Sequence, residues 1–144
     1  MANYFIIGLG TSHPRGNTYL DMASNLVMRL KNAKYLSQSE IQLSGGVGTD
    51  EPLTFWNKAI CIRSPLNPTT LWFELAAIET RLGRIRTKIN APRTIDLDLL
   101  WWSNDSFRDG WITLPHPRLY KRTFAIGLAQ QALLNFKLNA SGKN

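Results

Sequence analysis

Thr94-Ile95-Asp96-Leu97-Asp98-Leu99-Leu100-Trp101-Trp102 is the segment of this chain that says most about its fold. Apolar and acidic residues alternate along its first half, and side chains on a β-strand point alternately to the two faces of the sheet. The pattern predicts a strand that buries Ile95, Leu97 and Leu99. Asp96 and Asp98 would then point together to the other face, with their Cα atoms about 6.5–7 Å apart.

Strands and helices alternate on both sides of this stretch. Runs of β-branched and aromatic residues predict further strands over residues 4–9, 41–43, 55–63 and 111–114. Apolar residues three and four positions apart predict helices over residues 18–32, 67–82 and 123–138. Residues 44–52 are glycine-rich and residues 103–110 polar, so both are expected to be turns or loops. This order predicts an α+β fold, a ferredoxin-like sandwich with helices packed on a mainly antiparallel sheet.

The length and composition fit one small domain. With 144 residues and 44% hydrophobic residues, the chain is expected to form a single domain over residues 1–144. The single cysteine, Cys61, lies in an apolar run, which predicts a buried thiol and excludes an internal disulfide. No apolar run approaches the ~20 residues that cross a bilayer, and the N-terminus lacks the features of a signal peptide. We therefore expect a cytoplasmic protein.

Two charge patterns point to phosphate chemistry. A net charge of +7 suits nucleic acid, an anionic membrane or a polyphosphate substrate equally well. Two adjacent carboxylates repel each other unless a cation compensates them, and magnesium favours a few carboxylates together with phosphate oxygens and water. A bare Asp-x-Asp is more often a solvated acidic face. Here Arg84, Arg86 and Arg93 precede the pair, and guanidinium groups bind phosphate oxygens.

A histidine between two prolines is the third signal. Leu114-Pro115-His116-Pro117-Arg118 restricts the backbone around the imidazole, which is then able to donate a hydrogen bond to a phosphate oxygen. A lone histidine is usually structural. This segment therefore supports a phosphate site only in combination with the aspartate pair and the arginines. His13 has no such frame and is read as a surface residue.

The three signals occur in one order as Gly83-Arg84-Ile85-Arg86, then residues 91–100 beginning Ala91-Pro92-Arg93, then residues 114–118. As a set they resemble the 6-hydroxymethyl-7,8-dihydropterin pyrophosphokinases of folate synthesis, and the likeness runs from Phe5 to about Leu134. The resemblance implies an enzyme that uses ATP as co-substrate and two Mg²⁺ ions. It would move the β,γ-diphosphate of ATP onto the pterin hydroxymethyl oxygen and release AMP.

The resemblance also implies a role for particular residues. Asp96 and Asp98 match the carboxylates that hold the metal ions, and Arg84 and Arg93 match arginines that assist the transfer. The residues matched to the ATP side are Glu79, Arg84, Arg86, Arg93, Leu99, Thr113, His116 and Arg122. Those matched to the pterin side are Ser44, Gly45, Val47, Phe55, Asn57 and Phe124. Phe55 and Phe124 would enclose the flat ring, and the Asn57 amide would read its edge.

The departures from the family pattern leave alternatives open. The pterin loop at residues 44–48 lacks the family's proline, the segment 87–90 is short, and Trp111 replaces an arginine that is frequent on the family's nucleotide side. A divergent paralogue that binds ATP and magnesium but uses another acceptor, or is inactive, is the second hypothesis. An RNA-binding module is a distant third, because the acidic pair would repel a phosphate backbone and helix packing accounts for the tryptophans. We expect small-molecule substrates, no nucleic-acid or membrane partner, and a monomer.

Overall fold

The computed structural model of the chain describes residues 3–45, 54–83, 95–104, 106–119 and 123–141. The elements in chain order are β1 (Asn3–Thr11), α1 (Gly16–Met28), β2 (Lys34–Gln38), β3 (Gln42–Gly45), β4 (Thr54–Ser64), α2 (Pro68–Arg81), β5 (Asp96–Trp102), β6 (Phe107–Asp109), β7 (Ile112–Leu114), a 3₁₀ turn η1 (Pro117–Leu119) and α3 (Thr123–Ser141).

The main sheet has the strand order β2-β4-β1-β5, and every neighbouring pair in it is antiparallel. β3 pairs with β4 beyond the end of β2, on the same side of that strand. β6 and β7 form a separate two-stranded sheet. With α1 and α2 as the crossovers, this is the ferredoxin-like order that the sequence predicts, and the predicted α+β class is confirmed.

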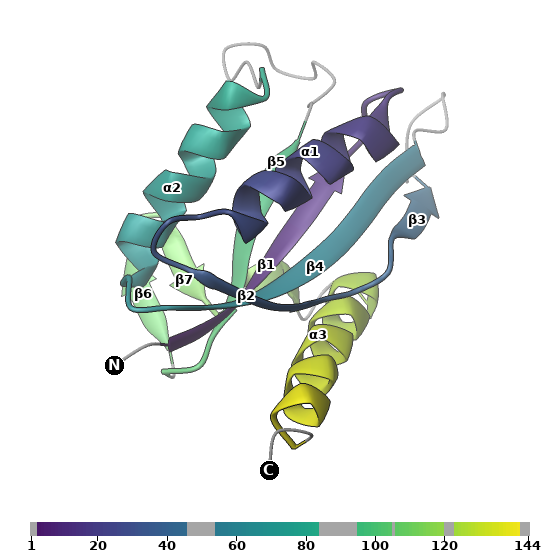
Figure 1. The fold of residues 1–144 in the computed structure, drawn as a ribbon. Helices are drawn as coiled ribbons and strands as arrows, with labels where there is room; N and C mark the ends of the chain where they lie inside the picture. The colour runs from purple at the N-terminus through teal and green to yellow at the C-terminus, as the bar shows by residue number, and fades with distance from the viewer. Residues whose placement is uncertain (1–2, 46–53, 84–94, 105, 120–122, 142–144) are drawn as a thin grey trace.

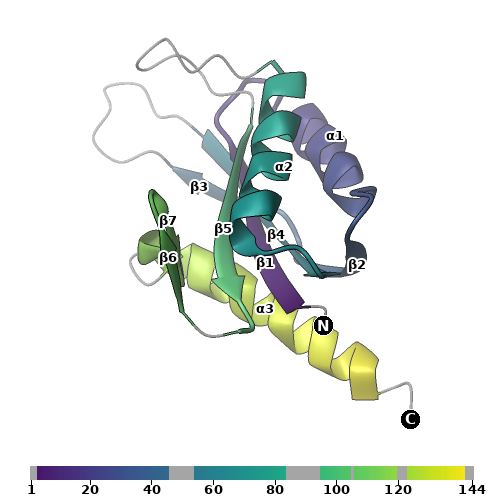
Figure 2. The ribbon, with the colours of Figure 1, turned by 90° about the vertical axis from the view of Figure 1, so that its left-hand side faces the viewer.

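The helices cover both faces of the sheet (Figures 1 and 2). α1 and α2 lie on one face, over a core that includes Phe5, Ile7, Leu71 and Leu75. α3 lies on the other face, where a smaller core gathers around Ile6, Cys61 and Ala132. In the described part of the chain, no helix combines the length and the apolar character needed to cross a membrane.

The second helix shows how local sequence sets an element. Asn67 caps α2 by accepting a hydrogen bond from the Thr70 N–H at 2.9 Å, and Pro68 occupies the first helical position. The buried stripe predicted from the spacing is present, and its members are Leu71, Leu75, Ile78 and Leu82. Gly83 has a φ of +87°, a conformation that glycine adopts without strain, and it lies just beyond the helix end.

Four elements differ from the sequence prediction. β2 and β6 were not predicted, β3 continues to Gly45 inside the predicted loop, and α1 ends at Met28 instead of residue 32. β2 has the polar sequence KYLSQ, and its strand form depends on pairing with β4, which local periodicity does not report. α1 ends early because the chain must turn into β2, and the Ser64 hydroxyl holds this connection by donating to the Asn32 carbonyl at 2.6 Å.

Candidate functional site

β5 presents its two aspartates on the face that carries α3. Ile95, Leu97 and Leu99 are buried in the core beneath α1 and α2, whereas Asp96 and Asp98 are partly exposed on the opposite face. A register shift near Leu100 then sets both Leu100 and Trp101 against the α3 core. The predicted alternation is therefore present, and the acidic half of β5 precedes the half that α3 covers.

The strand register arranges this face in three rows. The first row contains Asp96, Gly10 and Asn57, and the second contains Asp98, Gly8 and Ala59. The third row contains Trp101, Ile6 and Cys61, beneath α3. Neighbouring strands are about 4.8 Å apart, so Asn57 lies about 10 Å across the sheet from Asp96, with only a glycine between them.

Gly8 and Gly10 leave room for neighbouring side chains on this face of β1. A Cβ added to Gly10 would lie 3.3 Å from Asn57 Oδ1, and one added to Gly8 would lie 3.0 Å from a Leu100 methyl carbon. Both distances are tighter than ordinary van der Waals contact, so the space over the glycines is already used by these neighbours. The rows thus bring a carboxylate pair and a buried amide together without a bulky side chain on β1 between them.

A buried glutamate from α2 supports the carboxylate pair. Glu79 is only 3% exposed, and its Oε2 accepts a hydrogen bond from the Leu97 N–H at 2.8 Å. Leu97 is the residue between Asp96 and Asp98, so this bond fixes the backbone from which both aspartates project. Glu79 was predicted only through the family resemblance. A local pattern that could have indicated its burial is its position four residues after Leu75, on the apolar face of the helix.

His116 lies at the outer edge of the same strand. Its backbone N–H donates to the Leu100 carbonyl at 2.9 Å, which attaches the segment after β7 to β5. The side chain is partly exposed. Together with the Glu79 bond, this contact holds the outer edge of β5 at two points, and Leu99 lies between them. The Leu99 side chain is buried in the core, so only its backbone faces this edge.

The described pterin-side residues lie on β3 and β4, at the end of the rows opposite β5. Asn57 is 8% exposed, and its Nδ2 atom lies 3.4 Å from the carbonyls of Gln42 and Phe55. Phe55 is partly buried and is paired with Ser44 of β3, and the next pair joins Gly45 to Thr54. The structure therefore brings Ser44, Gly45, Phe55 and Asn57 together along the β3–β4 ladder.

Several predicted site residues are outside the described part of the chain. They are Val47, Arg84, Arg86, Arg93 and Arg122. Phe124 belongs to the first turn of α3, but the structure does not describe its side chain. Among the residues that are described, no group of three or more His, Cys, Asp or Glu side chains is arranged to hold a metal. The pair Asp96 and Asp98 fits magnesium, which needs only one or two protein carboxylates when phosphates complete its shell.

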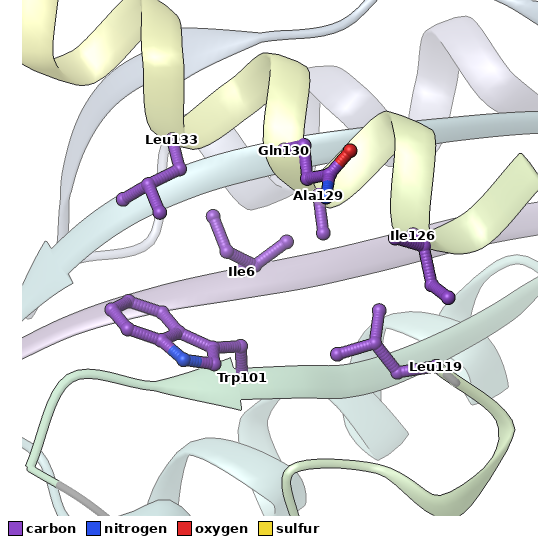
Figure 3. Close-up of a pocket in the computed structure, with 7 residues that line it drawn as sticks. All are labelled: Ile6, Trp101, Leu119, Ile126, Ala129, Gln130 and Leu133. Carbon is purple, nitrogen blue, oxygen red and sulfur yellow. The ribbon is translucent and has the colours of Figure 1, made fainter.

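A cavity of about 160 Å³ lies between α3 and the sheet (Figure 3). It is lined by Ile6, Trp101, Leu119, Ile126, Ala129, Gln130 and Leu133. This lining is almost wholly apolar and contains neither aspartate of β5. The cavity therefore lies over the third row and is distinct from the aspartates and Asn57 of the first two rows.

Cys61 has the structural role that its sequence context predicts. The thiol is buried beneath α3 in the third row, and burial raises its pKa to about 11. A thiol that remains protonated at neutral pH is a poor nucleophile. His13 was predicted to be a surface residue, but it is partly buried. Its ring centroid lies 4.7 Å from that of Tyr19, and its Nδ1 accepts a hydrogen bond from the Arg15 backbone N–H at 3.0 Å.

Comparison with known proteins identifies the family. A family model described as 7,8-dihydro-6-hydroxymethylpterin-pyrophosphokinase (HPPK) matches residues 6–132. The chain belongs to this family. A 2-amino-4-hydroxy-6-hydroxymethyldihydropteridine pyrophosphokinase of Bacillus subtilis (strain 168) is 33% identical over 126 residues, which are 88% of this chain and 75% of that protein. A protein of the same name from Campylobacter jejuni is 35% identical over 121 residues, 84% of this chain and 77% of that protein.

Solved structures share the fold. The chain superposes on a crystal structure of Plasmodium falciparum HPPK-DHPS with pteroate at a TM-score of 0.63 and 10% sequence identity. The match covers 88% of this chain and 38% of that longer one. At this identity the likeness concerns the fold alone. The predicted family, fold class and enzyme class are confirmed, and no comparison supports the alternative of a divergent or inactive paralogue.

Proposed function

We propose that the chain transfers a diphosphate group from ATP to the hydroxymethyl group of 6-hydroxymethyl-7,8-dihydropterin and releases AMP. Membership of the HPPK family supports this activity. The observation in the structure that carries it is the row Asp96–Gly10–Asn57. It sets an amide suited to a heterocycle across one glycine from Asp96, which forms with Asp98 of the next row an acidic pair suited to a magnesium-bound polyphosphate. The substrates are small molecules, and the protein acts as a single domain, a monomer, in the cytoplasm.

The chemistry needs little beyond positioning and charge. The hydroxymethyl oxygen loses its proton to water and forms a bond to the β-phosphorus of ATP, and the bond from that phosphorus to the bridging oxygen of the α-phosphate breaks, so that AMP leaves with this oxygen. Two Mg²⁺ ions held by Asp96 and Asp98 would supply charge neutralisation of the phosphates. Glu79 holds the Leu97 backbone so that both carboxylates keep their direction. Phosphoryl-type transfer by positioning and electrostatics requires no covalent enzyme intermediate.

The two substrates have separate sides of the site. On the pterin side, Asn57 binds the edge of the ring and Phe55 and Phe124 enclose it. Ser44 and Gly45 contribute the end of β3, and Val47 is assigned to this side by the family pattern. On the ATP side, we assign the backbone of Leu99 in β5, Thr113 in β7, and His116, whose N–H donates to the Leu100 carbonyl. Glu79 acts there through the β5 backbone, and the arginines assigned to the phosphates are Arg84, Arg86, Arg93 and Arg122.

The test is removal of one metal carboxylate. Asp98→Ala should lower pterin-dependent AMP formation by at least about a hundredfold, since a metal ion contributes several kcal/mol to the transition state. ATP binding, measured by calorimetry, should weaken only when magnesium is present. Glu74→Ala removes an exposed carboxylate of α2 and is the matched control. Full activity of Asp98→Ala would refute the metal assignment, and AMP formation that does not depend on the pterin would refute the acceptor.

A further inference from the structure

The core beneath α3 contains several small side chains. Three of the six described residues buried in it are Ala59, Cys61 and Ala132. The core on the other face of the sheet, beneath α1 and α2, consists mostly of leucine and isoleucine. Small side chains fill less of the space between a helix and a sheet. The α3 side of the sheet is therefore where unfilled volume is expected.

The cavity of about 160 Å³ is this unfilled volume. It lies over Ile6, with Trp101 and Leu133 at one end and Leu119 and Ile126 at the other (Figure 3). These residues come from β1, β5, η1 and α3. The wall is thus built by regular elements of the fold that pack on one another, and its shape is set before any molecule enters.

One face of α3 forms the roof of the cavity. The roof residues recur three and four positions apart, as residues on one side of a helix do, and they are Ile126, Ala129, Gln130 and Leu133. Ala129 lies above Ile6, between the larger side chains at the two ends (Figure 3). Because alanine has only a methyl group, the space between it and Ile6 stays open. The cavity thus depends on the small size of residue 129.

The lining determines which molecules the cavity can hold. Among the described residues around it, the Gln130 amide and the Trp101 indole N–H are the only polar side-chain groups. Water in such a cavity has few hydrogen-bond partners, so an apolar molecule displaces it readily. That molecule gains dispersion contacts with lining atoms that otherwise have no neighbour. Gln130 is exposed, so the cavity opens to solvent beside it.

We propose that the cavity is a binding site for an uncharged, apolar molecule with a single aromatic ring. The size follows from the volume, since an apolar cavity of about 150 Å³ binds benzene. The polarity follows from the lining, because a buried polar group without a partner costs binding free energy. ATP and the pterin are therefore excluded. The site lies over the row of Ile6 and Cys61, whereas Asp96 and Asn57 lie in another row.

The experiment measures the binding of fluorobenzene by fluorine NMR and compares Ala129→Leu with Gln131→Leu. A leucine at position 129 occupies the cavity, so the affinity should fall at least about tenfold. Gln131 is an exposed residue of α3 that is not part of the lining, so Gln131→Leu should bind the probe as the unsubstituted protein does. Equal affinity in Ala129→Leu and the unsubstituted protein would overturn the proposal.

Thermal unfolding gives a second measurement on the same proteins. Filling a void adds contacts, whereas a larger side chain in a packed core causes strain. The midpoint of Ala129→Leu should therefore be higher than that of the unsubstituted protein. Saturating fluorobenzene should raise the midpoint of the unsubstituted protein and leave that of Ala129→Leu unchanged. If the probe does not stabilise the unsubstituted protein, the binding site is refuted.

A cavity-enlarging variant tests the site even if Ala129→Leu fails to fold. Leu133→Ala removes bulk from one end of the cavity. It should bind naphthalene, which has two fused rings and which the unsubstituted protein should exclude. If naphthalene binds equally well to both proteins, the cavity does not set the size of the ligand, and the proposal fails.

Selectivity separates this cavity from the substrate site. Pyrimidine has the shape of benzene but two ring nitrogens that lose water on burial, so it should bind at least about tenfold more weakly. Neither ATP with magnesium nor 6-hydroxymethyl-7,8-dihydropterin should displace fluorobenzene. Displacement by the pterin would place the probe in the substrate site and refute the proposal. If the protein self-associates and fluorobenzene dissociates it in sedimentation, the gap is instead a contact between copies of the chain, which also refutes it.

Discussion

Replacing Glu79 by alanine should weaken both the fold and the metal site, because one hydrogen bond serves both. In the native protein, the carboxylate is buried and accepts from the Leu97 N–H at 2.8 Å. Alanine removes this acceptor and leaves a donor at the edge of β5 without it. A buried donor that loses its acceptor costs about 1–3 kcal/mol, so we expect a loss of about 2 kcal/mol in the free energy of unfolding.

This loss is large enough to measure. For a domain of this size, 1 kcal/mol corresponds to a change of about 2–4 °C in the midpoint of thermal unfolding. Glu79→Ala should therefore unfold about 4–8 °C below the unsubstituted protein when followed by circular dichroism. Glu79→Gln has nearly the same shape and keeps an acceptor oxygen, so its midpoint should fall by less than half as much.

The effect on function should follow the same order. Since Leu97 lies between the two aspartates, movement of its backbone changes the direction of both carboxylates. Affinity for a non-hydrolysable ATP analogue with magnesium should fall most in Glu79→Ala and least in Glu79→Gln, while affinity without magnesium should change little. The support role is refuted if Glu79→Ala unfolds at the original temperature and retains magnesium-dependent binding. Equal losses with and without magnesium would indicate direct contact with the nucleotide instead.

Three further predictions follow from individual contacts. Gly10→Ala places a Cβ 3.3 Å from Asn57 Oδ1, so the KM for the pterin should rise while magnesium-dependent ATP binding remains; an unchanged KM would show that Asn57 does not contact the pterin. Gly16→Ala brings its Cβ within 2.8 Å of Trp56 Nε1, inside van der Waals contact, and should destabilise the fold by about 1–3 kcal/mol in denaturant unfolding. Cys61 has its pKa raised from 9.0 to about 11 by burial, so below pH 9 the native protein should contain about a hundredfold less thiolate than an ordinary cysteine. The raised pKa keeps the proton on the native thiol, so stability should fall as pH rises above 9 and the unfolded thiol ionises; alkylation of the native protein at pH 8 as fast as of the denatured protein would contradict this.

The fold could be predicted well wherever one strand or helix face is buried against a continuous core. The alternation in residues 94–102 gave the correct faces of Ile95, Leu97 and Asp98, because each side chain's burial depends on the pleat of its own strand. The cap at Asn67 and the glycine after α2 were correct for the same local reason. β2 and β6 could not be predicted in this way, since their polar sequences become strands only through partners elsewhere in the chain.

The positions of the aspartates on β5 were predictable, the contacts that support them were less so, and the chemical roles given to all of these residues remain predictions. Asp96 and Asp98 were placed correctly by period two alone. The contact of Glu79 with Leu97 joins residues 18 positions apart, and no local pattern contains it. Trp111 was misjudged as a packing residue because an aromatic residue beside a strand is usually buried, whereas here the tight hairpin turn holds it out in water. The roles given to Arg84, Arg86, Arg93 and Arg122 remain predictions.

The position of α3 explains why a small sheet has room for two substrates. α3 covers the row that contains Ile6 and Cys61, and its core extends to Ala59 and Leu100 at the row of Gly8. The row of Gly10 continues beyond this core toward the acidic start of β5. A larger residue in place of Gly10 on β1 would separate Asp96 from Asn57. A helix that extended farther over the sheet than α3 does would cover both residues. This face of the sheet therefore has two parts, an apolar part under α3 and a polar part beside Gly10. The apolar part packs against α3, and the polar part leaves Asp96 and Asn57 outside the α3 core, as the proposed transfer requires.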